Sequence, residues 1–184
     1  MSGDRGVIWN DWFRGYTPTQ RAASIGDIKA LRMLLDRGTS VNEAPDSKSG
    51  RTALQAAALL KRKSGKMAII DLLLDRGANI NAEPAAEGGV TALQAAAIVG
   101  DLMLAKCFIT RGANVNAWPS AKHGRTAIEG AAEHGRLDMV QLLLNAGAVG
   151  NIVTGFKHPI ELAESNGHFT VAKLLKEASG GSGL

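Results

Sequence analysis

The chain has 184 residues, of which 45% are hydrophobic and 21% are charged, and its formal net charge is +4. This composition excludes an intrinsically disordered chain, and the length is sufficient for one domain with a substantial core. No apolar run is long enough for a transmembrane helix, no secretory leader is visible, and the single cysteine, Cys107, cannot form an internal disulfide. We therefore expect an intracellular protein, cytoplasmic or nuclear, with no membrane insertion.

The first segment, residues 1–16, is rich in aromatic residues. It holds half of all the aromatic residues in the chain: Trp9, Trp12, Phe13 and Tyr16. A stacked repeat structure needs an element that covers its open end. We therefore predict that residues 1–16 cap the first of the repeated units that follow, with a partner-binding arm as the alternative.

Five related units follow over residues 17–178. The phrase TALQAAA occurs at 52–58 and again at 91–97, and related phrases begin at Thr17, Thr126 and His158. Self-similarity at this period indicates units that are stable only when they are stacked. The units cover about residues 17–49, 50–88, 89–123, 124–155 and 156–178, and residues 179–184 are predicted to be a flexible tail.

Each unit is predicted to contain two short helices. In the second unit, Leu54, Ala57 and Ala58 occupy positions i, i+3 and i+4 of the first helix, and Thr52 precedes this helix as an N-cap. The second helix is predicted to end at Gly77 in a left-handed conformation. Its apolar face consists of Met67, Ile70, Leu73 and Leu74. The equivalent faces in the next two units are Leu102, Ala105, Phe108 and Ile109, and then Leu137, Val140, Leu143 and Leu144.

Three linkers between units share one length and two special residues. In the linkers 42–52, 81–91 and 116–126, the final threonine lies ten residues after the first asparagine. Each linker contains a proline at the same place and a glycine two residues before the threonine: Pro45 and Gly50, Pro84 and Gly89, Pro119 and Gly124. Proline restrains φ and glycine permits a tight turn. We therefore predict three ordered hairpins, which we call the first, second and third fingers.

The repeated pattern resembles the ankyrin-repeat family over residues 17–178. The family phrase is Thr-Pro-Leu-His-x-Ala-Ala, then Gly, Leu-Leu-Leu and Gly-Ala-x-Val-Asn. In the third unit, this phrase is matched at Thr91, Leu93, Ala95, Ala96, Gly100, Phe108, Gly112, Ala113, Val115 and Asn116. This chain has Ala for the usual Pro at 53, 92 and 127, and Gln or Glu for the usual His at 55, 94, 129 and 161. The resemblance implies an all-α fold, an α-solenoid of stacked helix-turn-helix units with β-hairpin-like fingers.

The sequence lacks recognisable motifs of catalysis or cofactor binding. The stretch KSGKM at 63–67 superficially matches a phosphate-binding loop, but Leu60 stands where that motif needs glycine and Met67 where it needs Ser or Thr. The histidines are spread over the third, fourth and fifth units without the spacing of metal ligands, at His123, His134, His158 and His168. We therefore expect no enzyme activity, no cofactor and no metal site.

A basic insertion, KRKSGK at 61–66, lies between the two helices of the second unit. Its four positive charges are compatible with a nuclear-import signal, or with contact to phosphate, an acidic protein or nucleic acid. The alternative is a solvated loop. Nucleic acid is the least favoured of these partners.

The resemblance also implies which residues would face a protein partner. Mapped onto this chain, they include Arg51, Leu59, Leu60, Val90, Ile98, Val99, Arg125, Glu133 and His134; Trp118 is added because it stands just before Pro119 on the third finger, a poor place to bury an indole. The aliphatic residues at 59, 60, 98 and 99 are expected to form an exposed apolar centre. Arg51 and Arg125 would form its basic rim, with Trp118 as an energetic anchor. Alternatively, the fingers fold over the aliphatic residues and bury them.

These features predict a monomeric, non-catalytic protein–protein interaction module that binds a protein partner through the concave surface formed by the fingers and the first helices. Two alternatives remain. The chain could be a regulatory or sensor domain that docks on other domains of a larger protein. It could also bind nucleic acid or an acidic partner weakly through residues 61–66.

Overall fold

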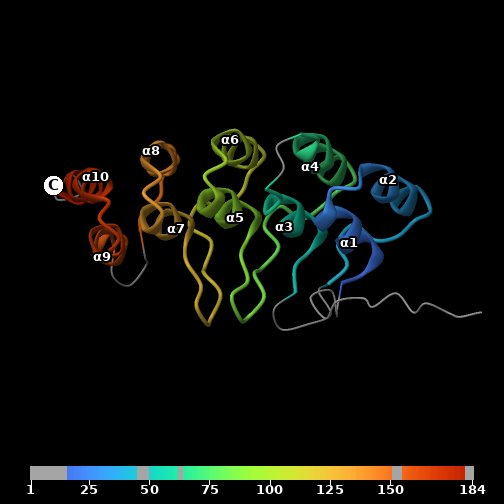
Figure 1. Cartoon of the computed structure of the whole chain (residues 1–184), viewed down its shortest axis with the longest axis horizontal. Coiled ribbons are helices and arrows are strands. Elements are labelled where there is room, and N and C mark those ends of the chain that lie inside the picture. Colours follow the sequence, from blue (N-terminus) through green and yellow to red (C-terminus); the bar gives the residue numbers. More distant parts are fainter. Residues whose placement is uncertain (1–15, 45–49, 62–63, 151–154, 181–184) are drawn as a thin grey trace, which may run out of the picture.

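The computed structural model describes residues 16–44, 50–61, 64–150 and 155–180. In this part of the chain, ten helices and no strand form five pairs in a row (Figure 1). The pairs are α1 (Pro18–Ile25) with α2 (Ile28–Asp36), α3 (Ala53–Ala58) with α4 (Lys66–Asp75), α5 (Ala92–Val99) with α6 (Leu102–Thr110), α7 (Ala127–Glu133) with α8 (Leu137–Asn145), and α9 (Lys157–Ser165) with α10 (Phe169–Gly180). The all-α solenoid predicted from the sequence is therefore confirmed.

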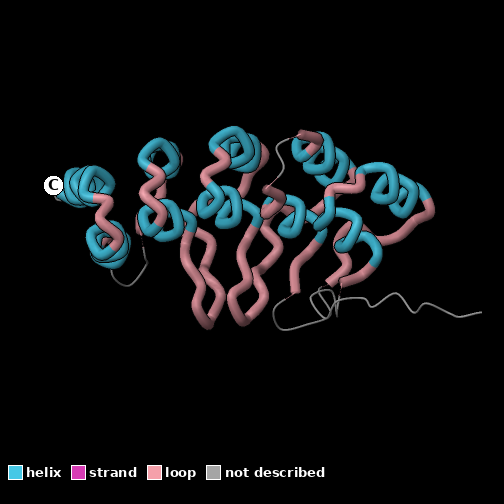
Figure 2. Tube along the Cα trace, in the orientation of Figure 1, coloured by secondary structure: helices cyan, strands magenta, loops and turns pink. Residues whose placement is uncertain are grey.

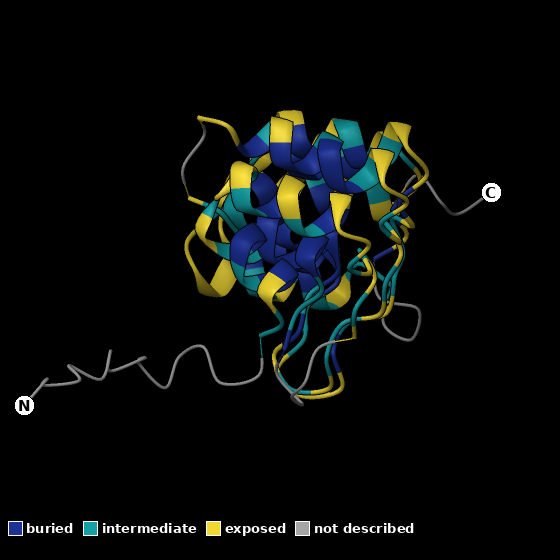
Figure 3. Cartoon of the chain, turned by 90° about the vertical axis from the view of Figure 1, so that its right-hand side faces the viewer, coloured by how far each residue is buried: buried dark blue, intermediate teal, exposed yellow. Residues whose placement is uncertain are grey.

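The helices form two rows. The first helix of each pair lies in one row and the second helix in the other, and the loops from α4 to α5 and from α6 to α7 project beyond the row of first helices (Figure 2). Figure 3 shows that buried residues concentrate between the rows and exposed residues on the outer faces. Helix α10 continues to Gly180, so residues 179–180 are helical rather than part of the predicted tail. Residues 181–184 lie outside the described part of the chain.

The first helices pack closely because the residues between them are small. Ala57, Ala96 and Ala131 are completely buried, and α5 packs between α3 and α7. The second helices supply the larger core residues. Among them, Leu73, Phe108 and Leu143 have no exposed surface. Each helix pair buries its small and large apolar side chains against the neighbouring pairs, so no single unit could bury its own apolar faces alone.

The predicted core face of α8 needs one correction. Val140 and Leu143 are fully buried, as expected, but 39% of Leu137 is exposed. Leu137 is the first residue of α8, and Met139 rather than Leu137 fills the core at this end of the helix, with 2% exposed. The side chain of Leu137 is therefore left at the edge of the second row.

A reciprocal pair of hydrogen bonds begins four of the five first helices. The hydroxyl of Thr52 accepts a hydrogen bond from the amide of Gln55 (3.3 Å), and the amide of Thr52 donates to Gln55 Oε1 (3.0 Å). Threonines 17, 91 and 126 form the same capping box. The predicted N-cap is confirmed, because this exchange satisfies two donors that a helix start otherwise leaves unpaired.

The glutamines of the capping boxes also hold the fingers. The buried side-chain amide of Gln55 donates to the carbonyls of Ala82 and Glu83 at 2.9 and 3.0 Å. Glutamines 20 and 94 repeat this contact with the carbonyls of residues 43–44 and 117–118. One side chain thus caps a helix and anchors the finger that leads to the next unit.

The fourth unit uses a different pairing at this position. Glu129 cannot donate as glutamine does, and its Oε1 lies 2.8 Å from Nδ1 of His158 in the fifth unit. His158 stands where the other units have the capping threonine, and α9 begins without a side-chain cap. The Gln-to-Glu change at 129 and the Thr-to-His change at 158 therefore belong to one contact between neighbouring units.

Asparagines at the start of the three linkers also join neighbouring units through hydrogen bonds. The Asn81 side chain donates to the carbonyl of Gly112 at 3.0 Å and accepts from the amide of Asn114 at 2.7 Å. Asn42 and Asn116 make the corresponding bonds one unit earlier and one unit later. Each unit is therefore fixed to the next by polar contacts as well as by the apolar core.

Candidate functional site

The second and third fingers are joined to each other near their tips. The amide of Gly88 donates to the carbonyl of Lys122 (2.9 Å), and the amide of Lys122 donates to the carbonyl of Ala86 (3.0 Å). Lys122 Nζ also pairs with Glu87 Oε1 at 2.8 Å. Figure 1 shows the two fingers side by side, projecting on the same side of the helices. The two fingers are therefore ordered, as predicted; residues 45–49 of the first finger, including Pro45, lie outside the described residues.

The glycines of these two fingers are required by close approach of the backbone. A Cβ atom at Gly89 would collide with the backbone of Ala85, and one at Gly124 with the backbone of Ser120. Ser120 is itself buried and donates its hydroxyl to the carbonyl of Ala86 at 3.0 Å. The hairpin geometry thus depends on the glycine position that the sequence pattern identified, whereas the role of Ser120 was not predicted.

Trp118 is exposed on a fixed backbone. Of its surface, 58% is accessible. The carbonyls of Ala117 and Trp118 both accept a hydrogen bond from the side-chain amide of Gln94 at 3.1 Å, and only 1% of Gln94 is exposed. The position of the Trp118 backbone is therefore set by a buried side chain of the preceding first helix.

Arg125 and Glu133, two of the predicted binding residues, form an ion pair with each other. Arg125 Nε lies 2.9 Å from Glu133 Oε2, and Nη2 lies 3.4 Å from Oε1. Arg125 is thus not the unpaired rim cation that the sequence suggested, because the carboxylate at the end of α7 reaches back to the end of the third finger. His134, the next residue, has its Nδ1 3.0 Å from the carbonyl of Gly130.

The predicted aliphatic centre is half-buried rather than exposed. Leu60 lies against Gly26 of the first unit, and Ile98 lies over Gly130 of the fourth unit, so that each packs on a neighbouring unit. Leu59 is likewise half-buried against the core, and Val99 is half-buried. The exposed apolar patch expected from the sequence is therefore not present in that form, because neighbouring glycines make room for these side chains.

The remaining predicted residues, Arg51 and Val90, are half-buried. Arg51 Nη1 donates to the hydroxyl of Tyr16 at 3.2 Å. Val90 packs against the core at the end of the second finger. Their participation in binding remains a prediction.

The basic insertion contains one charge that is not solvated. Lys66 is the first residue of α4, with only 3% of its side chain exposed, and its Nζ lies 3.0 Å from Asp101 Oδ2. Lys61 is exposed, and residues 62–63 lie outside the described residues. Both sequence interpretations of 61–66, a charged contact surface or a solvated loop, are thus wrong for Lys66, because Asp101 of the next unit partners it.

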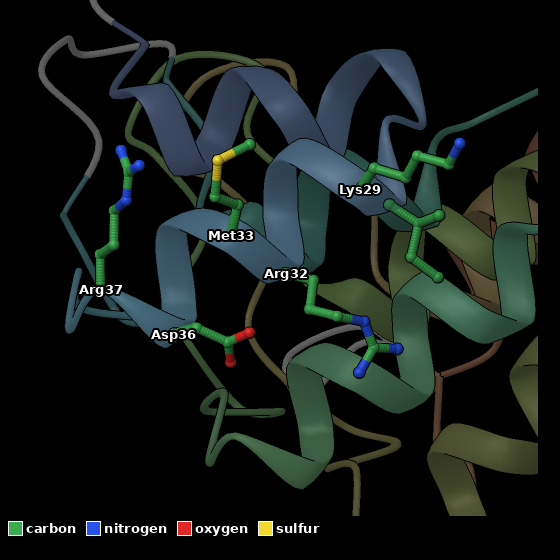
Figure 4. A pocket seen from close by; sticks show the side chains of 6 residues that line it. Lys29, Arg32, Met33, Asp36 and Arg37 are labelled. Atoms are coloured by element: carbon green, nitrogen blue, oxygen red, sulfur yellow. The ribbon is translucent and has the colours of Figure 1, made fainter.

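A separate depression of about 460 Å³ lies along α2, on the first unit of the row. Its lining combines charged residues with Met33, which is exposed, and Figure 4 shows these side chains around the helix: Lys29, Arg32, Met33, Asp36 and Arg37. Asp36 pairs with Arg76 of the second unit at 2.6 Å. The predicted cap for this unit, residues 1–16, lies outside the described residues except for Tyr16, so the cap remains a prediction.

The described residues contain no group of three His, Cys, Asp or Glu side chains placed to hold a metal ion. Nor does any helix among them have the length and apolar character needed to cross a membrane.

Comparison with known protein families identifies the repeat. A family model described as ankyrin repeats in three copies matches residues 4–84 and 63–154. No curated protein matches the chain. Helices α9 and α10 lie beyond the matched residues, but they pair with each other and stack on α7 and α8 as the preceding pairs do. Ankyrin repeats are generally protein–protein interaction modules, and proteins of this type are typically not enzymes. Because the matches together extend over residues 4–154, more than half of the chain, this protein belongs to the ankyrin-repeat family.

Proposed function

We propose that this chain is a non-catalytic interaction module that binds a partner protein on the side of the second and third fingers. The surface consists of Val90, Trp118, Arg125, Glu133 and His134, and we call it the finger surface. The observation that carries the proposal is the exposed indole of Trp118 on a backbone held by the buried Gln94.

An exposed tryptophan on a fixed backbone is suited to act as an anchor. Tryptophan is among the residues that contribute most to protein interfaces, where truncation costs about 2 kcal/mol or more. Binding also costs entropy when loops must become ordered. The hydrogen bonds between the second and third fingers reduce that cost here, because both fingers are already joined through Gly88 and Lys122.

The charged pair of Arg125 and Glu133 on the finger surface offers specificity. The side chains of Arg125 and Glu133 are 30% and 29% exposed, so both groups remain accessible to a partner while they hold each other in place. Such partly exposed charges favour a polar rim around an aromatic anchor. The expected partner is therefore a protein segment with an apolar pocket or groove for the indole and a hydrogen-bonding edge for the pair.

The test is affinity capture from a native extract with the wild-type chain and a Trp118→Ala variant, followed by measurement of Kd for each captured protein. The matched control is Met33→Ala, because Met33 is similarly exposed but lies on α2, away from the fingers. We expect Trp118→Ala to raise the Kd for the partner by about 30-fold, the equivalent of about 2 kcal/mol. Equal Kd values for all three proteins would overturn the proposal.

A further inference from the structure

Three depressions adjoin one another along the turns between first and second helices. The first, of about 400 Å³, and the second, of about 360 Å³, share Gly100 and Arg136. The third, also about 360 Å³, shares Leu137 with the second and extends to α10. Each depression therefore borders the next through shared lining residues, from the second unit to the fifth, and we call the three together the turn furrow.

The turn furrow is separate from the finger surface. Each finger leads into the N-terminal end of a first helix, whereas the turn follows the C-terminal end. For α5, Val90 precedes the helix and Val99 ends it. Eight helical residues span about 12 Å, so Val90 and Trp118 lie toward the finger end of the first helices, whereas Glu133 and His134 end α7 next to Gly135 and Arg136 of the turn furrow.

Apolar side chains line the middle of the turn furrow. Met103, which is 72% exposed, lines the first depression with the half-buried Val99 and Leu102, and Leu137, which is 39% exposed, lines the second depression with Leu102. Large apolar residues that cluster in a groove on a protein surface mark a site of interaction.

Positive charge is concentrated at one end of the turn furrow. The first depression is lined by Lys61, Lys66 and Arg136 against one carboxylate, Asp101, a formal net charge of +2. Lys66 and Asp101 neutralise each other. Lys61 and Arg136 are exposed and form no side-chain hydrogen bond or ion pair with another described residue. Two cations are therefore available to a ligand at this end.

The position of Arg136 depends on a glycine of the preceding unit. A Cβ atom at Gly100 would lie 2.8 Å from Arg136 Nε and 3.0 Å from its Cδ. The absence of a side chain at Gly100 therefore lets the arginine lie across the turn, beside the apolar residues. His168 lies in the same way over Gly135 in the next pair of units, which shows that the arrangement follows the repeat.

The other end of the turn furrow has the opposite charge. The third depression is lined by Asp138, Lys173 and Glu177, a formal net charge of −1, and Lys173 pairs with Glu177 at 4.0 Å. A ligand with negative charge is thus attracted to the Lys61 and Arg136 end and repelled from the α10 end, which gives it a direction in the groove.

We propose that the turn furrow binds an extended peptide segment of a partner protein in which acidic residues flank a bulky apolar side chain. The apolar side chain lies on Met103 and Leu137, and the acidic residues pair with Lys61 and Arg136. None of the five residues of the finger surface lines these depressions, so peptide binding here should not require Trp118.

The test is selection of a displayed library of random linear peptides on the full chain, with Kd then measured by fluorescence anisotropy. We expect enriched peptides to contain Asp or Glu next to Leu, Met or Phe. Their affinity should fall by about tenfold or more in the double variant Lys61→Ser, Arg136→Gln, because two charge-assisted contacts are lost. It should fall similarly in Met103→Asp, which leaves both cations in place.

Two controls isolate the site. The double variant Lys29→Ser, Arg32→Gln removes the same charge from α2 and should bind the peptides like the wild type, as should Trp118→Ala. Thermal unfolding confirms that each variant is folded. The proposal is overturned if no peptide is enriched, if enriched peptides lack acidic residues, or if the α2 variant loses as much affinity as the Lys61 and Arg136 variant. Loss of peptide binding in Trp118→Ala would instead assign the peptides to the finger surface.

Discussion

Lys66 and Asp101 form a buried ion pair between neighbouring units, with 3.0 Å between Nζ and Oδ2. Asp101 also accepts a hydrogen bond from the amide of Leu104 and thereby caps α6. One carboxylate therefore neutralises a buried cation of the second unit and begins a helix of the third. This relationship makes the two partners unequal in their effect on stability.

We expect Asp101→Ala to lower the free energy of unfolding by about 2–3 kcal/mol, because it leaves the charge of Lys66 buried without a partner and removes a helix cap. Lys66→Met should cost less than about 1 kcal/mol, since it replaces the buried charge with an apolar chain of similar length. Urea unfolding followed by circular dichroism measures both. If Lys66→Met were less stable than Asp101→Ala, the unpaired charge of Lys66 would not be the main source of the loss in stability.

The contact between Ile98 and Gly130 is open to a double-mutant cycle. A Cβ atom at residue 130 would lie 2.6 Å from Ile98 Cγ1, so Gly130→Ala should destabilise the chain by about 1–3 kcal/mol through overpacking. This loss should exceed any gain from the higher helix propensity of alanine. In an Ile98→Ala background the same substitution should be neutral or stabilising. Additive effects of the two substitutions, measured by thermal unfolding, would mean that Ile98 does not pack on α7.

Gln94 is expected to stabilise the third finger. Gln94→Leu leaves the carbonyls of Ala117 and Trp118 without their donor and removes half of the capping box, at a cost of about 2–3 kcal/mol. Amide hydrogen exchange should become faster across residues 116–126. Gln141→Leu is the control, because Gln141 is exposed and bonds only to Asn145; it should change stability by less than about 0.5 kcal/mol. If exchange across residues 116–126 were unchanged in Gln94→Leu, this glutamine would not be what holds the Trp118 backbone in place.

The bridge between the fingers has a buried and an exposed component, which should contribute differently. Ser120→Ala removes a hydroxyl that lies 3.0 Å from the carbonyl oxygen of Ala86 and 2.8 Å from that of Lys122, and it should cost about 1 kcal/mol, with faster exchange at the amides of Gly88 and Lys122. Glu87→Gln breaks only the exposed ion pair with Lys122 and should cost less than about 0.5 kcal/mol. A larger effect of Glu87→Gln in the same exchange experiment would contradict this order.

The parts of the fold that were predictable from the sequence are those set by neighbouring residues along the chain. The capping threonines precede their helices directly, and the glycine of each finger follows the proline at a fixed distance. A repeated sequence therefore predicts both. The role of the glutamines was missed, although their constant place three residues after threonine matches the capping-box pattern.

The features that were missed depend on residues in other units. Lys66 ends the basic stretch that begins at Lys61, and its burial depends on the packing of α4 beside Asp101 of the next unit. The burial of Leu60 and Ile98 depends on Gly26 and Gly130 in adjacent units. The exposure of a side chain on a helix depends on which residues of the neighbouring units pack against it. The sequence of one unit therefore predicted the helix but not which of its side chains are accessible.

The central claim is that a partner protein binds at the finger surface. Hydrogen–deuterium exchange of the chain alone and in complex with a captured partner tests this claim most directly. We predict that protection on binding appears in residues 116–126 and α7, and that it disappears with Trp118→Ala at the same partner concentration. Protection confined to α2 or α10, with no change in the third finger, would contradict the account.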